Sequence, residues 1–307
     1  MNQGIQSLVG WQGGSRWSCA VPAVRLCLRN VTDYVTIVHM ERLSGAVRAP
    51  ASADWLLSRG TSAMTVPDLA DLLDVPDDQV RRRLHAPASR GEWVQPVRGL
   101  WVPVPPEYRT WGAPPGIELV DAMMRHLDTR YYVGWLSAAA IHGAAHQAPQ
   151  VFQVAVDRMV RDRTVGRTRF RFVQRPSAID LPTIERPTRS GTARVSTPEV
   201  TALDLATDAE LAGGVDNSAT VIIELAESDA FDTTTLAALA MRFPAASGRR
   251  VGYVLEHFAD DDDLEPLHTA VAARSSSPSR LDPTRPAAGP VDERWRVCVN
   301  RELEPEA

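Results

Sequence analysis

Residues 65–84, TVPDLADLLDVPDDQVRRRL, contain two short helical patterns separated by a tight turn. In the first, apolar residues recur at helical spacing after Thr65, a typical N-cap residue that is followed by a proline in the first turn. The second pattern starts at Asp77, where acidic side chains favour the positive end of the helix dipole. Two short helices joined by a turn of three or four residues predict a helix-turn-helix unit.

The segments on either side extend this unit. A short helix is expected to end near Gly60. After the unit, residues 92–96 and 100–104 supply strand-type side chains, and the turn at 97–99 contains a glycine suited to a hairpin. Helix, helix, helix and hairpin in this order predict a winged helix-turn-helix domain, which we place at residues 46–104.

The second helix of the unit has an apolar side and a basic side. With Val80 and Leu84 on the buried side, a rotation of 100° per residue points Arg82 away from the core. Such a helix can enter the major groove of DNA, where arginine reads guanine and glutamine reads adenine. The residues expected to contact DNA are Thr65, Gln79, Arg81, Arg82, Arg83 and, at the hairpin tip, Arg98. A solvated charged face is the alternative: Asp78 and Arg82 have the i,i+4 spacing of an ion pair, and Asp77 and Asp78 would repel DNA.

The composition of the whole chain excludes several classes of protein. It has 307 residues and a formal net charge of -5, which excludes a uniformly basic nucleic-acid coat. The sequence contains no lysine, so a P-loop lysine or a Schiff base is excluded. The three cysteines include no C-x-x-C pair, which indicates a reducing compartment and no structural zinc site. No apolar stretch is long enough to span a membrane, and we expect a cytoplasmic protein.

Composition also divides the chain into segments. Residues 1–45 have scattered glycines and no clear caps, and we expect a poorly ordered extension or a misassigned start, with translation beginning near Met40. Residues 105–116 are rich in proline and predict a linker. Residues 117–307 predict a mixed α/β domain with a mobile loop at 275–290. The whole chain is therefore expected to have an α+β fold.

Alternating and helical patterns fill the second half. The strand expected at 167–173 has phenylalanines on one face and arginines on the other. Arg167, Arg169 and Arg171 could bind nucleic-acid phosphates or an acidic partner, and a solvated sheet face is the alternative. Further expectations are a strand at 151–156, a capping box at 196–199, helices from about 219, 234 and 248, and a strand at 294–303 that returns to the sheet.

Two arrangements could form metal sites: the acidic run 260–263, which we interpret as a solvated loop or helix cap, and a histidine pair. His142 and His146 are four residues apart, a spacing that can place two ligands on one helix face. No glutamate follows His142 as in a zincin, and no third ligand is evident nearby, so we favour packing or hydrogen bonding. The sequence has no recognisable nucleophile–base pair or phosphate loop. We expect no catalytic residue, no metal and no cofactor.

Two longer stretches carry a family resemblance. The first is YYVGWLSAAAIHG at 131–143, followed by HQAPQ at 146–150, and the second is VSTPEVTALDL at 195–205. They resemble the signatures of AbiEi-type antitoxins of bacterial type IV toxin–antitoxin, or abortive-infection, systems, over about residues 50–305. We interpret the signature residues as structural: Gly134, Ser137, His142, Gly143, His146, Gln147, Pro149, Gln150, Ser196, Thr197, Pro198, Glu199, Asp204 and Leu205.

The resemblance implies a two-part antitoxin that is not an enzyme and acts in phage defence. Its winged helix would repress its own operon by binding inverted repeats in double-stranded DNA at the promoter. Its C-terminal domain would counter a nucleotidyltransferase-like toxin encoded next door, without needing a stable complex. Two alternatives stay open. One is a winged-helix transcriptional regulator with a ligand-sensing C-terminal domain and no toxin partner, and the other is a metal-dependent enzyme.

Overall fold

The computed structural model describes residues 48–145, 149–176, 180–259 and 263–305. The expectations for residues 1–45, including a start near Met40, lie outside the described residues. The described residues belong to one unit, residues 45–307, and their helices and sheets confirm the expected α+β fold class.

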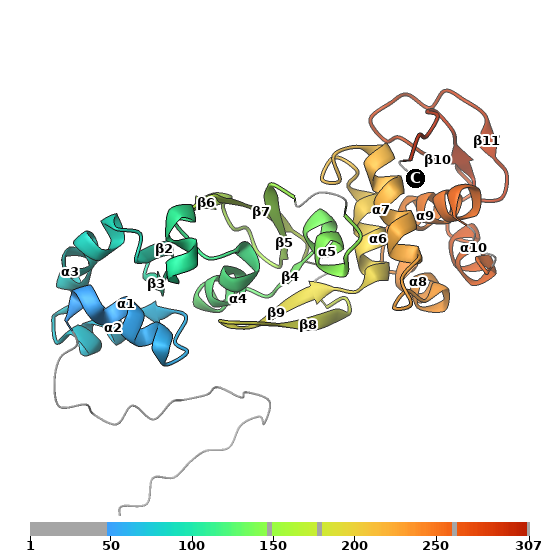
Figure 1. Cartoon of the computed structure of the whole chain (residues 1–307). Helices are drawn as coiled ribbons and strands as arrows, with labels where there is room; N and C mark the ends of the chain where they lie inside the picture. The colour runs from blue at the N-terminus through green and yellow to red at the C-terminus, as the bar shows by residue number, and fades with distance from the viewer. Residues whose placement is uncertain (1–47, 146–148, 177–179, 260–262, 306–307) are drawn as a thin grey trace, which may run out of the picture. The chain divides into compact units, whose positions relative to one another are not determined.

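The N-terminal elements are helices packed on a small sheet. Their bounds are α1 Ala49–Ser58, β1 Met64–Thr65, α2 Val66–Leu73, α3 Asp77–Ser89, β2 Trp93–Val97 and β3 Leu100–Pro103 (Figure 1). The strands pair in the order β1-β3-β2, and both pairs are antiparallel. Asp74 has a left-handed conformation, which ends α2 and turns the chain towards α3. This is the element order of a winged helix, with α2 and α3 as its helix-turn-helix.

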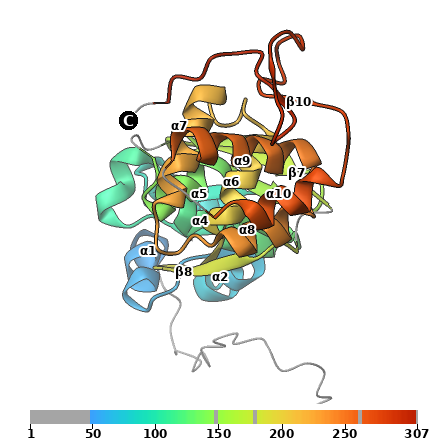
Figure 2. The ribbon, with the colours of Figure 1, turned by 90° about the vertical axis from the view of Figure 1, so that its right-hand side faces the viewer.

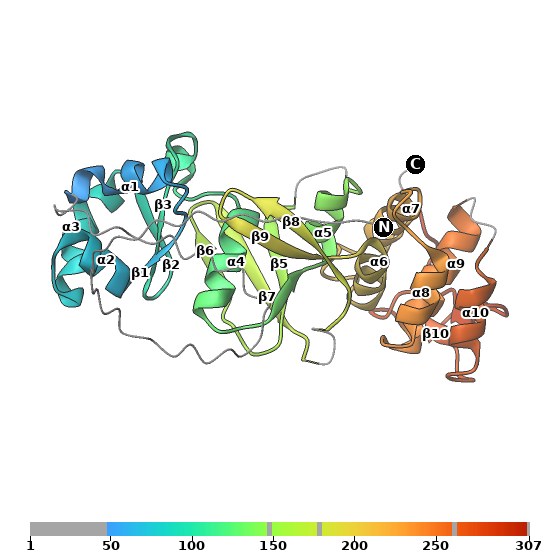
Figure 3. The same cartoon turned by 90° about the horizontal axis from the view of Figure 1, so that it is seen from below.

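A mixed six-stranded sheet follows, in the order β6-β7-β5-β4-β9-β8. Its strands are β4 Tyr131–Val133, β5 Val151–Val156, β6 Arg163–Val165, β7 Thr168–Gln174, β8 Thr183–Thr188 and β9 Gly191–Ser196. The pairs β5–β7 and β4–β9 are parallel, and the others are antiparallel. Helix α4, Gly116–His126, packs against β9 (Figure 3).

The sheet separates two apolar cores, because successive side chains of a strand point to opposite faces. On the α4 side, Val154 and Phe170 share a buried cluster with Met123 of α4 and with Leu100 of β3. On the other side, Ala155 belongs to the large cluster formed with the C-terminal helices. The hairpin β2–β3 therefore buries part of its surface in the same core as α4.

A group of six helices forms the second core, and two of them, α5 and α6, contact strands of the six-stranded sheet. The six are α5 Trp135–His142, α6 Pro198–Thr207, α7 Val215–Ala226, α8 Thr233–Ala240, α9 Ala245–Phe258 and α10 Glu265–Ala272. Helix α6 is buried along most of its length and contacts α5, α7, α8 and α9 (Figure 2). The second family-like stretch, at 195–205, thus lies at the centre of this group.

The strand expected at 294–303 is wrong in length and in place. Only β12, Val297–Cys298, is extended there, and it pairs with β10, Ser279–Arg280, and β11, Val291–Asp292, in a separate small sheet. Trp295 is buried beside α9 at Gly252, where any larger side chain would collide with the indole. Arg296 has a positive φ of 54°, which interrupts an extended chain.

Two segments expected to be linker or loop make regular contacts. Residues 105–116 contain a 3-10 helix, η1 Pro106–Trp111, and Arg109 in it forms an ion pair of 2.6 Å with Asp54 of α1. In 275–290, the buried Arg249 of α9 donates to main-chain carbonyls, among them that of Ser277 at 2.8 Å. The expected domain boundaries stay a prediction; these contacts join both segments to neighbouring elements, although most residues of 275–290 are exposed.

Candidate nucleic-acid interface and signature residues

Helix α3 has the two-sided character that its sequence predicted. Val80 and Leu84 are fully buried, while Arg81, Arg82 and Arg83 are exposed. Among the described residues, no ion pair or hydrogen bond engages any of these three guanidinium groups. In the described structure, Arg82 does not form the i,i+4 ion pair with Asp78 that its spacing allows. Three cations at one helix surface are therefore available to an external anion.

The other predicted DNA contacts on the helix-turn-helix are less free. Gln79 is half-buried at the start of α3. Thr65 caps α2 in a reciprocal capping box: its hydroxyl donates to Asp68 Oδ2 at 2.6 Å, and its main-chain N–H donates to the same oxygen at 3.0 Å. A carboxylate thus already occupies the end of α2 at which a phosphate would bind.

Arg98 is exposed at the tip of the β2–β3 hairpin, but its main chain is anchored. A hydrogen bond of 3.0 Å joins the Arg98 carbonyl to Nε2 of His126 in α4. Arg163 of β6 donates to the Pro96 carbonyl at 3.2 Å. The main chain of the hairpin is thus held against α4 and the six-stranded sheet, while the Arg98 side chain is exposed and can contact a partner.

The three arginines of the 167–173 strand differ from one another. Phe170 is buried, and Arg167 and Arg169 are exposed, as the alternation predicted. Arg171 forms an ion pair of 2.9 Å with Asp162, so its charge is partly neutralised. Only two of these arginines therefore present unpaired charge among the described contacts.

The two family-like stretches meet in a buried network around Asp204 of α6. Tyr132 of β4 donates its hydroxyl to Asp204 at 3.1 Å. A side chain at Gly134 would place its Cβ only 3.2 Å from Asp204 Oδ2 and 3.0 Å from the Tyr132 ring, so these groups would have to shift to accept it. Asp204 is fully buried, and this burial raises its pKa to about 7 despite the nearby Arg175 guanidinium.

Arg175, Asp208 and Trp135 complete this network. Arg175 forms an ion pair with Asp208, lies 3.5 Å from Asp204 and stacks over the Trp135 ring at 5.2 Å. The indole N–H of Trp135 donates to Asp208 at 3.1 Å. We name Tyr132, Trp135, Arg175, Asp204 and Asp208 the signature network. Arg175 lies outside both stretches, and only the need of a buried carboxylate for a cation could have pointed to it.

Two further signature residues join α5 to the strands. Ser137 donates to the Val151 carbonyl at 3.2 Å and accepts from the Gln153 N–H at 2.8 Å. His142 forms a 2.8 Å hydrogen bond to the Ser196 carbonyl, and burial lowers its pKa. A hydrogen-bonded histidine was the favoured interpretation. His146, its partner in the metal hypothesis, and residues 260–262 of the acidic run lie outside the described residues, which contain no cluster of three or more potential metal ligands.

The start of α6 differs in detail from the expected capping box. Thr197, not Ser196, is the N-cap, and its hydroxyl accepts from the Val200 N–H at 3.4 Å. Ser196 instead donates to the Val133 carbonyl at 3.2 Å. Glu199 is buried and accepts from the Asp232 N–H at 3.0 Å, which ties α6 to the start of α8.

The remaining signature positions are backbone and packing positions. Gly143 ends α5 in a left-handed conformation, Pro198 opens α6 and Leu205 is fully buried. Pro149 and Gln150 precede β5, and Gln147 lies outside the described residues. The described signature residues thus hold strands and helices together.

The fold and these contacts define an α+β protein whose N-terminal helices and hairpin are followed by a six-stranded mixed sheet. The sequence model of the AbiEi antitoxin C-terminal domain matches residues 132–257, which include the whole signature network. The chain therefore carries an AbiEi antitoxin domain, and the resemblance to AbiEi-type antitoxins is confirmed. This domain supports an antitoxin of the toxin–antitoxin or abortive-infection type.

A solved structure shares the fold. The RV2827C protein from Mycobacterium tuberculosis is similar with a TM-score of 0.57 and 18% sequence identity, over 82% of this chain and 93% of that one. No curated protein matches the sequence. In the described part of the chain, none of the helices has both the length and the apolar character needed to cross a membrane.

Proposed function

We propose that the protein is a type IV antitoxin that represses its own operon through α3 and neutralises a nucleotidyltransferase-like toxin. The observation that carries the DNA-binding half is the exposed, unpaired state of Arg81, Arg82 and Arg83 on the outer face of α3. We assign residues 46–104 to DNA binding and residues 117–307 to the antitoxin function.

The chemistry of α3 favours DNA over other anionic partners. A helix of this length fits the major groove, where Arg82 can donate two hydrogen bonds to guanine O6 and N7. Arg81 and Arg83 flank it and can reach the phosphates on either side of the groove. Two copies on an inverted repeat would read half-sites one helical turn apart, or a multiple of it.

A gel shift of the full chain tests the repressor half. The DNA is the region upstream of its own gene, at a stated salt concentration because phosphate contacts depend on salt. We expect saturable binding that survives excess random DNA, and weaker binding by Arg82→Ala. Arg242→Ala is the matched control, since it removes the same charge from an exposed site on the antitoxin domain. Equal binding of operator and random DNA would contradict the proposal.

Neutralisation is tested separately by co-expression with the nucleotidyltransferase-like toxin encoded nearby. The AbiEi antitoxin domain supports this half of the proposal. We expect wild type and Arg82→Ala, both from a heterologous promoter, to restore growth, because α3 is not needed for it. Failure of the stably folded wild-type chain to restore growth would contradict the antitoxin role and favour a regulator without a toxin partner.

A further inference from the structure

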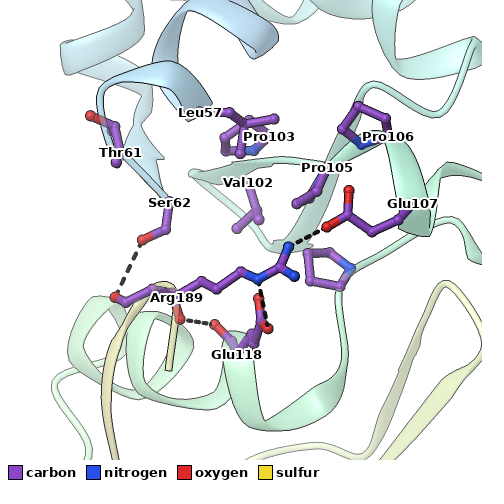
Figure 4. A pocket seen from close by; sticks show the side chains of 13 residues that line it. Leu57, Thr61, Ser62, Val102, Pro103, Pro105, Pro106, Glu107, Glu118 and Arg189 are labelled. Carbon is purple, nitrogen blue, oxygen red and sulfur yellow. Dashed lines mark hydrogen bonds and ion pairs between the residues drawn. The ribbon is translucent and has the colours of Figure 1, made fainter. Parts of the chain in front are cut away.

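A pocket of about 290 Å³ lies where the β8–β9 turn approaches the N-terminal elements (Figure 4). Its apolar wall comes from Leu57 of α1, from Val102 of β3 and from the prolines at 103, 105, 106 and 114. Proline rings have little conformational freedom, so this wall is largely preformed. The volume is at the lower end of the range of small-molecule sites, which limits the occupant to a small compound.

The polar side of the pocket carries two carboxylates and one guanidinium. Arg189, from the β8–β9 turn, forms an ion pair with Glu107 of η1. Its Nε lies 4.0 Å from Oε1 of Glu118 in α4, which is beyond hydrogen-bond distance (Figure 4). The charged groups that line the pocket therefore sum to one net negative charge.

Glu118 is the incompletely compensated group. Only 15% of its side chain is exposed, and among the described contacts its carboxylate accepts no hydrogen bond. Burial raises the pKa of Glu118, and Arg189 offsets this only in part. A second cation beside the carboxylate would replace the hydration that it has lost.

We propose that this pocket binds a small organic cation, with an apolar body against the proline wall and an ammonium group at Glu118. Arg189 has a long, mostly exposed side chain that stays paired with Glu107 and can swing away from Glu118 to admit the ligand. An anionic ligand would gain Arg189 but meet both carboxylates at close range. The proposal concerns a binding site and does not depend on DNA binding or on toxin neutralisation.

The pocket also connects segments that are far apart in the sequence. Ser62 donates to the Ser190 carbonyl at 3.3 Å, and Ser190 donates to the Glu118 carbonyl. An occupant would therefore contact the N-terminal elements, η1, α4 and the β8–β9 turn at once. Such a ligand would stabilise their arrangement, as any ligand that binds only the folded state does.

Three probes with one apolar body and different charge test the proposal on the full chain. They are benzylammonium, benzyl alcohol and benzoate, each titrated by isothermal calorimetry and by ligand-observed NMR. We expect saturable binding of benzylammonium, at least tenfold weaker binding of benzyl alcohol and no binding of benzoate. The proposal is overturned if benzylammonium does not bind at a concentration of 10 mM, which corresponds to a dissociation constant of about 10 mM, the weakest affinity of interest. Equal binding of the three probes also overturns it.

Variants locate the binding site. Glu118→Gln keeps the shape of the side chain and removes its charge, so we expect about tenfold weaker binding of benzylammonium and little change for benzyl alcohol. Glu185→Gln, at an exposed position of β8, is the matched control and should bind like wild type. Circular dichroism and the melting temperature verify folding. Unchanged binding by a folded Glu118→Gln variant would place the probe elsewhere and overturn the assignment.

Discussion

The outer face of α3 and the signature network differ in where they place charged side chains and in whether these side chains are paired. On α3, Arg81, Arg82 and Arg83 are exposed and unpaired within the described structure. In the network, Asp204 is fully buried, the Arg175 side chain is only 16% exposed, and each has partners within the chain. Unpaired surface charge contributes little to stability and is available to a partner, whereas buried charge is costly unless it is paired. The comparison therefore separates residues that bind from residues that hold the fold.

The largest expected effect is on stability, at Trp135. Its side chain is fully buried, stacks on Tyr132 with ring centroids 6.5 Å apart and donates to Asp208. Trp135→Ala should lower the free energy of unfolding by roughly 3–5 kcal/mol, measured by urea denaturation. Trp135→Phe keeps an aromatic ring and should cost less. A loss below about 1 kcal/mol in Trp135→Ala would mean that the network is not a structural centre.

The second prediction is a pH dependence from Asp204. Its pKa is raised from 3.8 to about 7, so between these values the folded state holds a proton that the unfolded state has released. The contribution of Asp204 to the free energy of unfolding is therefore largest below about pH 4. It falls by up to roughly 4 kcal/mol as the pH rises to about 7. Asp204→Asn should remove this loss and keep a side chain of the same shape.

The measurement is urea unfolding of wild type and Asp204→Asn at pH 4.5 and pH 7.5. His142 acts in the opposite direction, because its lowered pKa makes stability fall below about pH 6.5. This contribution is present in both proteins and cancels in their difference. Equal pH dependence of the two proteins would contradict the raised pKa of Asp204.

The same contrast explains what the sequence could predict. The helix-turn-helix is encoded by neighbouring residues: the cap at Thr65 and the apolar spacing of Val80 and Leu84 act within one or two helical turns. The signature stretches were found by resemblance, but their contacts were not. Tyr132 and Asp204 are 72 residues apart, and such a pair is brought together only by the sheet and α6.

The local pattern of residues 294–303 failed because tertiary contacts override it. Residues 294–303 alternate like a strand, yet the space at Gly252 accepts the Trp295 ring and turns the chain away from the main sheet. The proline-rich segment 105–116, which stays predicted as a linker, also has distant partners, because Arg189 and Asp54 form ion pairs with Glu107 and Arg109. In both segments these partners are distant in the sequence.

The third prediction moves to α3 and to DNA affinity. Because Arg82 has no partner within the described structure, Arg82→Ala should change the free energy of unfolding by less than about 0.5 kcal/mol. It should weaken operator binding by roughly 1–3 kcal/mol and relax base preference at one position of each half-site. Competition gel shifts with single-base operator variants measure this. If Arg82→Ala binds like wild type, the arginines of α3 are better interpreted as a solvated charged face.

The smallest expected effect is at Arg98. This residue combines the two features compared above, an exposed charged side chain and a hydrogen bond within the chain. Its main chain is anchored to His126, while its side chain is exposed. Arg98→Ala should therefore leave folding unchanged and weaken binding to operator and random DNA by the same factor, with the salt slope reduced by about 1. Affinities at several salt concentrations test this. A sequence-dependent loss would make Arg98 a base-reading residue, and no loss at all would mean that the anchoring to α4 turns the hairpin tip away from the DNA.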